Sequence, residues 1–233
     1  LYRDILDTRP HHAGALNGLG IVCQQQGRLP EAVDYFQHAL ARRPEFAGGH
    51  CNLGATLYAL GRLDEAATCF DRALALQPEL AEAHNRLGMV RRGQGRLEEA
   101  LECYRRAVAL APDLAEAHNN LGNALRELEQ VQEAIRHYQR ALTVKPDFAE
   151  AHNNLGFALY LQHRLDEAIA HYTRAIELNP RYAQAHNNLA TALHDRGRLG
   201  EDDEGMRIAL PHFRRALELQ PDFAETYSNL LFA

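Results

Sequence analysis

The chain has 233 residues, of which 46% are hydrophobic and 24% are charged, a composition that excludes a long disordered protein. Its 31 acidic residues outnumber the 25 basic ones, giving a formal net charge of -6. Because phosphate binding needs a clustered basic surface, we expect no nucleic-acid partner. No run of about 18 apolar residues is present, so we expect no membrane partner either.

Four cysteines are scattered along the chain without a CxxC spacing. The absence of a CxxC spacing argues against a zinc site or a redox motif. Scattered cysteines fit a protein in a reducing compartment, so the expected location is cytoplasmic. The chain begins with Leu1, and we expect it to be a segment of a longer protein.

Prolines recur with a fixed period of 34 residues. They are Pro10, Pro44, Pro78, Pro112, Pro146 and Pro180. Pro221 follows 41 residues after Pro180, which indicates an insertion of seven residues. A fixed period of this length is the signature of a repeat array.

Each repeat contains two amphipathic segments when its proline is numbered position 32. Positions 4, 7, 8 and 11 share one helix face, and positions 17, 20, 24, 27 and 28 share another. Position 8 is small, and position 24 is always aromatic. Gly27, Gly61, Gly95 and Gly197 stand at position 15, where a glycine permits a left-handed turn between two helices. Proline at position 32 then ends the second helix.

The period therefore predicts stacked helix hairpins, since one hairpin cannot bury its own apolar face. The predicted divisions are a partial repeat at 1–12, six repeats at 13–46, 47–80, 81–114, 115–148, 149–182 and 183–223, and a partial repeat at 224–233. This pattern resembles the tetratricopeptide repeat. The resemblance implies an all-α tetratricopeptide-repeat solenoid, a superhelix of antiparallel helix hairpins.

Position 6 faces away from the core side of the first helix, and it carries asparagine in most repeats. Asparagine is a mediocre helix former, so its recurrence in mid-helix needs a reason. An amide offers one donor and one acceptor group, which match a peptide group of any sequence. We therefore expect an extended segment of a protein or peptide to be held there, although simple repeat duplication would explain the pattern as well.

Apolar residues at position 9 lie on the same stripe and favour the groove. The predicted peptide-binding residues are Asn52, Asn120, Asn154, Asn188, Asn229, Arg86, Met89, Asn123 and Phe157. Gly18 and Arg86 interrupt the asparagine column near the N-terminus. The sequence leaves open whether the solenoid also pairs with a second copy to form a homodimer.

Three other columns have a structural explanation beside a functional one. Asparagines at position 5 either join neighbouring helices by hydrogen bonds or contact the ligand. Histidines at position 4 are expected in the packing, and the cysteines and histidines at position 23 are too far apart between repeats to share a metal ion. Residues 200–206, which contain four acidic residues, are expected to form a surface bulge or, alternatively, an acidic contact site.

No catalytic motif appears, so we expect no enzyme activity of this segment, no cofactor and no metal site. The phrases AHNNLG at 117–122 and 151–156, with the asparagine column, resemble the repeat region of bacterial SPINDLY-like O-linked N-acetylglucosamine transferases. In that family the position 6 asparagines hold the protein substrate. The resemblance implies a substrate-recruiting, non-catalytic region of a longer glycosyltransferase that uses a UDP-sugar.

The alternative is a free-standing adaptor for assembly or chaperone complexes. A chaperone-binding carboxylate clamp would use positions 5 and 9 of one repeat and positions 2 and 6 of the following ones. Asn52 and Arg86 fit that clamp, whereas Asn17, Ile21 and Glu82 do not.

Overall fold

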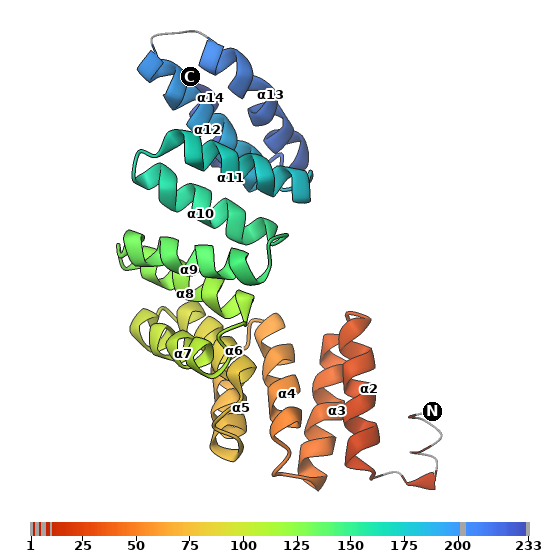
Figure 1. The fold of residues 1–233 in the computed structure, drawn as a ribbon. Helices are drawn as coiled ribbons and strands as arrows, with labels where there is room; N and C mark the ends of the chain where they lie inside the picture. The colour runs from red at the N-terminus through yellow and green to blue at the C-terminus, as the bar shows by residue number, and fades with distance from the viewer. Residues whose placement is uncertain (1, 3–4, 6–7, 10, 201–203, 232–233) are drawn as a thin grey trace. The chain divides into compact units, whose positions relative to one another are not determined.

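A computed structural model describes residues 2, 5, 8–9, 11–200 and 204–231 (Figure 1). Within these residues every regular element is an α-helix, as the period predicts. The first helices of the hairpins are α2 (Ala13–Gln25), α4 (Ala47–Ala59), α6 (Ala81–Gly93), α8 (Ala115–Glu127), α10 (Ala149–Leu161) and α12 (Ala183–Gly200). The second helices are α3 (Leu29–Arg42), α5 (Leu63–Leu76), α7 (Leu97–Leu110), α9 (Val131–Val144), α11 (Leu165–Leu178) and α13 (Glu204–Leu219), and α14 (Ala224–Leu231) follows. The predicted helix over residues 1–12 falls largely outside the described residues.

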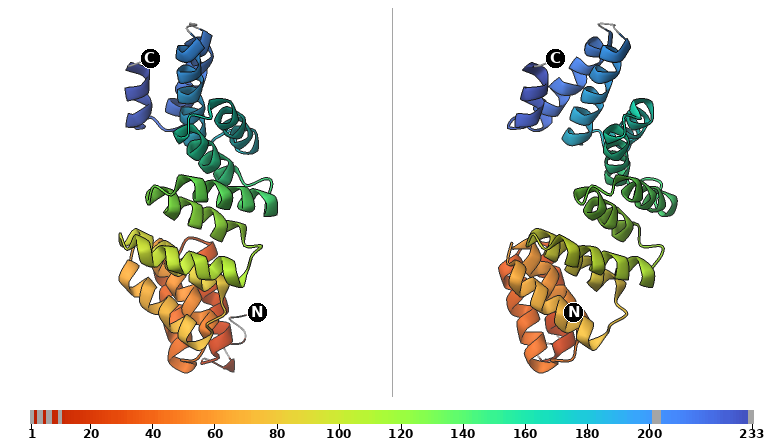
Figure 2. Two further views of the ribbon diagram at one scale, coloured as in Figure 1. Left: turned by 60° about the vertical axis from the view of Figure 1, so that its left-hand side comes forward. Right: turned by 90° about the vertical axis from the view of Figure 1, so that its left-hand side faces the viewer.

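The chain forms two compact units, Leu1–Pro112 and Asp113–Ala233. Within each unit the two helices of a hairpin pack against each other, and the second helix also packs against the first helix of the next hairpin (Figure 2). This is the tetratricopeptide-repeat arrangement. None of the described helices is both long enough and apolar enough to span a membrane.

The aromatic residue at position 24 is the centre of every hairpin. These side chains are at most 1% exposed, and they are Phe36, Phe70, Tyr104, Tyr138, Tyr172 and Phe213. In each of the first five hairpins the ring lies against the position 8 glycine of the same hairpin. A Cβ atom on Gly122 would come within 2.6 Å of the Tyr138 ring, so only a glycine allows this approach.

The turns between the two helices confirm three of the four predicted glycines. Gly27, Gly61 and Gly95 have φ angles of 75°, 74° and 76°. The same left-handed position is occupied by Glu129 (φ 61°) and His163 (φ 58°) in the next two hairpins. Side chains with a Cβ atom are strained in this region, so these two turns are formed against the local preference.

The last hairpin differs from the prediction. Gly197 does not end its helix but is buried inside α12, which continues to Gly200. Gly205 lies in α13, and a Cβ atom there would come 2.6 Å from the Cα atom of Gly197. The expected surface bulge is therefore wrong where it is described, because the two glycines let two lengthened helices pack closely. The acidic residues 201–203 lie outside the described residues.

Candidate peptide-binding groove

The position 6 residues lie on the first helices, next to the position 5 residues that turn toward the following hairpin. Four asparagines at position 6 donate a hydrogen bond from Nδ2 to the Oδ1 atom of the position 5 asparagine one repeat earlier. The pairs are Asn52 to Asn17 (3.1 Å), Asn154 to Asn119 (2.9 Å), Asn188 to Asn153 (3.0 Å) and Asn229 to Asn187 (3.3 Å). We call these the amide pairs.

The amide pairs confirm that the position 5 asparagines join neighbouring helices. They also show that the position 6 asparagines are partly used by the array itself, which sequence reasoning did not foresee. An asparagine amide has two N–H donors and one carbonyl acceptor, so one hydrogen bond leaves groups for a ligand. In Asn52 and Asn154, Oδ1 accepts no hydrogen bond from any residue that the structure describes.

Two of the asparagines are more fully occupied. Oδ1 of Asn188 accepts a hydrogen bond from Gln184 at 3.2 Å, and the side chain is only 7% exposed. Nδ2 of Asn229 also lies 3.1 Å from the hydroxyl of Thr191. Their remaining capacity for a ligand is smaller than that of Asn52 and Asn154.

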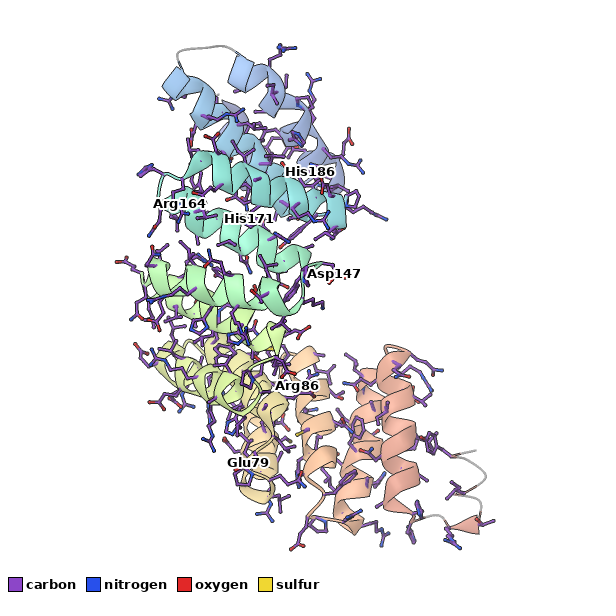
Figure 3. All side chains as sticks on the ribbon, in the orientation of Figure 1. Glu79, Arg86, Asp147, Arg164, His171 and His186 are labelled. Atoms are coloured by element: carbon purple, nitrogen blue, oxygen red, sulfur yellow. The ribbon has the colours of Figure 1, made fainter. Side chains whose placement is uncertain are left out.

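The unit of residues 1–112 has a hollow of about 340 Å³ that brings Asn52 and Arg86 together. Its wall also contains Cys51, Glu82 and the amides Gln24 and Gln77. The Arg86 side chain is exposed on α6 (Figure 3) and forms no ion pair with any described residue. Burial raises the pKa of the Cys51 thiol, so this cysteine is a neutral part of the wall. Met89 is half-buried and lies outside this hollow.

Gly18 leaves the position 6 stripe open at the first repeat, and an aromatic ring occupies that space. A Cβ atom on Gly18 would come 2.5 Å from the ring of Tyr2. The interruption of the asparagine column is therefore covered by the ring of Tyr2.

The unit of residues 113–233 has a hollow of about 210 Å³ with a different lining. Phe157, Asn188 and Asn229, all predicted from the sequence, meet there with Tyr160 and Thr191. The rings of Phe157 and Tyr160 are stacked with centroids 6.5 Å apart. The guanidinium of Arg126 lies 5.1 Å from the Phe157 centroid on the same side of the unit, a cation–π contact.

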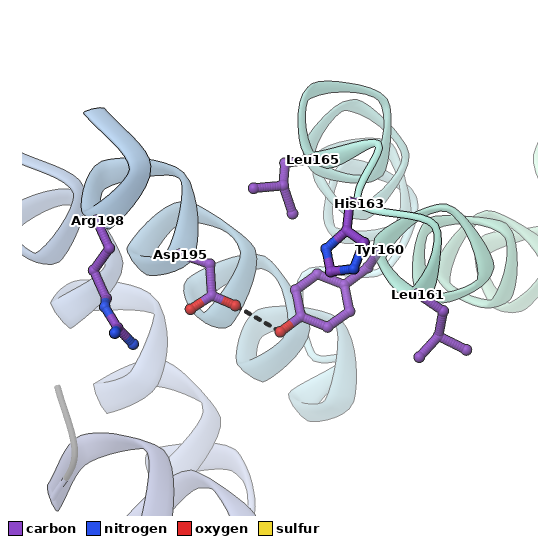
Figure 4. A pocket seen from close by; sticks show the side chains of 6 residues that line it. All are labelled: Tyr160, Leu161, His163, Leu165, Asp195 and Arg198. Atoms are coloured by element: carbon purple, nitrogen blue, oxygen red, sulfur yellow. Dashed lines mark hydrogen bonds between the residues drawn. The ribbon is translucent and has the colours of Figure 1, made fainter. Parts of the chain in front are cut away.

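Tyr160 also lines a larger hollow of about 570 Å³, with Leu161, Leu165, Asp195 and Arg198 (Figure 4). Its hydroxyl donates a hydrogen bond of 2.6 Å to Asp195. Burial and this carboxylate raise the pKa of Tyr160 to about 12, so the hydroxyl stays protonated. Tyr160 thus joins the two hollows into one aromatic and amide surface along α10 and α12.

Two predicted residues of this unit are placed differently. Asn123 is 7% exposed, and its Oδ1 accepts a 2.8 Å hydrogen bond from the buried hydroxyl of Tyr138. It therefore belongs to the packing beneath the surface. Asn120 is half-buried and lines none of the hollows described above.

Sequence reasoning missed Tyr160, which stands at position 12. The signal was available, because position 12 holds a polar or aromatic residue in every repeat. Those residues are Gln24, Tyr58, Arg92, Arg126, Tyr160 and His194. Position 12 lies one turn beyond position 9 on the same stripe.

Histidines at position 4 are packed as expected, but each of the last three also pairs with a histidine at position 23. The Nδ1–Nδ1 distances are 3.1 Å for His118 and His137, 3.0 Å for His152 and His171, and 3.2 Å for His186 and His212. Burial lowers the pKa of His152, His171, His186 and His212. Among the described residues no group of three metal-ligating side chains is placed to hold an ion.

Comparison with known proteins identifies a sequence family and several solved structures that resemble this chain. No significantly similar protein is found among those with curated functions. Among solved structures, the APC/C hetero-tetramer Cut9–Hcn1 superposes with a TM-score of 0.86 at 23% identity, over 99% of this chain. This chain spans only 44% of that protein's chain.

Two further structures match over most of both chains. PilF of Pseudomonas aeruginosa has a TM-score of 0.81 at 19% identity, covering 97% of this chain and 100% of its own. YrrB, described as a tetratricopeptide-repeat protein with an unusual peptide-binding site, has a TM-score of 0.63 at 26% identity, covering 83% and 96%.

The sequence family described as the cilia and flagella-associated protein 70 C-terminal domain matches residues 1–195, which include the first five hairpins and most of α12. This chain therefore belongs to that family of tetratricopeptide-repeat domains.

Proposed function

We propose that this tetratricopeptide-repeat domain is a scaffold that holds an extended polypeptide against the first helices of its hairpins. The observation that carries the proposal is the convergence of amide, aromatic and guanidinium groups on hollows in each unit. Asn52 and Arg86 meet in one hollow, and Phe157, Asn188 and Asn229 meet in the other. Amides serve the main chain of a ligand, and the aromatic rings and the arginine serve its side chains.

YrrB adds support, because it is a tetratricopeptide-repeat protein with an unusual peptide-binding site. The binding residues proposed here are Asn52, Arg86, Asn154, Phe157, Asn188 and Asn229. Asn123 is left out, because its carbonyl oxygen is already bonded to Tyr138. Asn120 and Met89 stay at the margin of the proposal, since neither lines a hollow. Asn154 lines none of them either, but it is kept because it is only partly buried and its Oδ1 atom accepts no hydrogen bond from a described residue.

The test starts from peptides selected on this chain from a phage-displayed library of random dodecapeptides. A selected peptide, labelled with fluorescein, is titrated in fluorescence anisotropy. We expect the Asn52→Ala/Arg86→Ala variant or the Phe157→Ala variant to weaken binding about tenfold, which corresponds to about 1.4 kcal/mol.

Matched controls lie away from the hollows. Asn179→Ala removes an exposed amide at the end of α11, and Arg105→Ala removes an exposed arginine of α7. Both controls should bind like the parent chain. Failure to select any peptide, or equal affinity in all four variants, would rule the proposal out.

A finer form of the proposal is the recruitment of protein substrates for an O-linked N-acetylglucosamine transferase. Its support is the AHNNLG phrases and the asparagine column alone. If it holds, changing Asn120, Asn154 and Asn188 together to alanine in the full-length gene product reduces glycosylation of protein substrates from a UDP-sugar. Unchanged glycosylation leaves the free-standing adaptor as the better description.

A further inference from the structure

The amide pairs are formed between repeats, so each groove asparagine is bonded to a residue outside its own hairpin. The acceptors are deeply buried: Asn17 is 8% exposed, Asn119 1%, Asn153 4% and Asn187 1%. The donors Asn52, Asn154 and Asn229 are only partly buried and face the surface. Three of the four pairs thus join a deeply buried inner amide to a partly exposed outer one, whereas the donor of the fourth pair, Asn188, is itself only 7% exposed.

The inner amide of Asn119 is itself held in one orientation. Nδ2 of Asn119 donates a 3.1 Å hydrogen bond to the carboxylate of Glu150, which can only accept. Its Oδ1 must therefore face Asn154, and Asn154 must answer with an N–H group. The Oδ1 atom of Asn187 accepts a second hydrogen bond, of 2.9 Å, from the hydroxyl of Thr226.

A free asparagine amide can turn over and exchange its oxygen for its nitrogen at little cost. An outer amide bonded to a fixed acceptor cannot do so without losing a hydrogen bond. Asn154 therefore presents its Oδ1 and its second N–H in one arrangement. A main chain lying on the stripe meets acceptors and donors whose order is set in advance, which lowers the entropy cost of binding.

The sequence varies in step with these pairs. Asparagine at position 5 of one repeat is followed by asparagine at position 6 of the next in five of the six consecutive combinations. In the sixth combination both members differ, with Cys51 followed by Arg86. The two positions therefore change together within this one chain.

We propose that the position 5 asparagines are positioning residues of the groove, which fix the orientation of the next repeat's position 6 amide for a bound main chain. This inference rests on the proposed peptide-binding function. It adds that buried asparagines without contact to the ligand determine the orientation of the amides that do bind it.

The first test needs no ligand. In ¹⁵N-edited NMR spectra of the chain, one Nδ2 proton of Asn188 should exchange slowly with solvent, because it is bonded to Asn153. Asn153→Leu should remove that protection, whereas Asn153→Asp keeps an acceptor oxygen and should retain it. Equal exchange in the parent chain and the leucine variant would overturn the inference.

The second test builds a new amide pair where the chain has none. Arg86→Asn alone places an unanchored amide in the groove, and adding Cys51→Asn should anchor it. With the selected dodecapeptide, we expect Cys51→Asn to tighten binding about three- to tenfold in the Arg86→Asn background. In the parent background, where Arg86 needs no anchor, the same change should give no such gain, so the measured quantity is the difference between the two backgrounds.

The two tests separate the two ideas. If no dodecapeptide is selected, the proposed function fails while the exchange experiment still decides on the positioning role. If peptides bind but Cys51→Asn has the same effect in both backgrounds, the positioning role fails and the groove remains.

Discussion

The Nδ1 atom of His152 lies 3.0 Å from the Nδ1 atom of His171, while its Nε2 atom lies 3.1 Å from the carbonyl oxygen of Pro146. Because a carbonyl only accepts, Nε2 of His152 carries the proton. Nδ1 of neutral His152 then accepts the N–H of His171. If both Nδ1 atoms carried protons, two donors would face each other and the pair would break, so the contact needs at least one neutral histidine.

Acidification should therefore destabilise the unit of residues 113–233. The pKa values of His152, His171, His186 and His212 are lowered by burial, and the partner histidine lowers those of His171 and His212 further. Between these values and the ordinary pKa of about 6.5, the unfolded chain binds more protons than the folded one. Stability is thus fully present above that pH and is lost as the pH falls through the folded-state values.

Urea unfolding followed by circular dichroism at pH 7.5, 6.5 and 5.5 measures this loss. The double variant His171→Cys/His212→Cys is the control, because Cys69 and Cys103 stand at the same position in the other unit. It should unfold with a weaker dependence on pH. An identical dependence in both proteins would mean that the histidine pairs are not responsible.

Glycine substitutions in the two left-handed turns that lack glycine should increase the stability of the fold. A residue with a Cβ atom in a left-handed backbone costs the folded state about 1–2 kcal/mol, so replacing Glu129 or His163 by glycine removes this strain. Glycine also raises the conformational entropy of the unfolded chain, which offsets part of the gain. We expect each change to stabilise the fold by about 0.5–1 kcal/mol. The reverse change, Gly61→Ala, should destabilise it, and thermal unfolding compares the three. A lower melting temperature for Glu129→Gly would contradict the argument.

Gly122 should not tolerate a methyl group. Alanine there would bring a Cβ atom to 2.6 Å from the Tyr138 ring, whose hydroxyl is tied to Asn123. Overpacking of this kind costs about 1–3 kcal/mol, which urea unfolding detects. Gly14→Ala, where the nearest atom is 3.2 Å away on the exposed His12 side chain, is the tolerated counterpart.

Substitution of Asn123 should lower the stability of the fold without changing its affinity for the peptide. Asn123→Ala leaves the buried Tyr138 hydroxyl without its acceptor and should cost about 1–3 kcal/mol in urea unfolding. Affinity for the selected dodecapeptide should stay the same, in contrast to Phe157→Ala. Weaker peptide binding by Asn123→Ala at temperatures where it is folded would return this residue to the groove.

The fold was predictable because its determinants repeat. The aromatic residue at position 24, the glycine at position 8 and the proline at position 32 each recur in fixed register, and together they specify a hairpin that must stack. The exception was the last hairpin, where Gly197 was expected to end a helix. A glycine can end a helix or allow another helix to approach, and only the spatial partner, here Gly205, distinguishes the two.

The groove was predictable only in part. The outward stripe follows from the helical period, and the structure places Asn52, Asn188 and Phe157 of that stripe in the linings of the hollows. What the period cannot give is which polar atoms are already bonded. The amide pairs and the contact between Asn123 and Tyr138 join residues of different helices, so they depend on the packing and not on the spacing along one helix.

The amide pairs imply that the repeats are not freely interchangeable modules. Excising 115–148 or 149–182 would still leave an asparagine opposite an asparagine at the new junction. Excising 47–80 alone would set Asn17 opposite Arg86, and excising 81–114 alone would set Cys51 opposite Asn120. Removing both together matches Asn17 with Asn120, so an asparagine faces an asparagine at the new junction only when these two repeats are removed together.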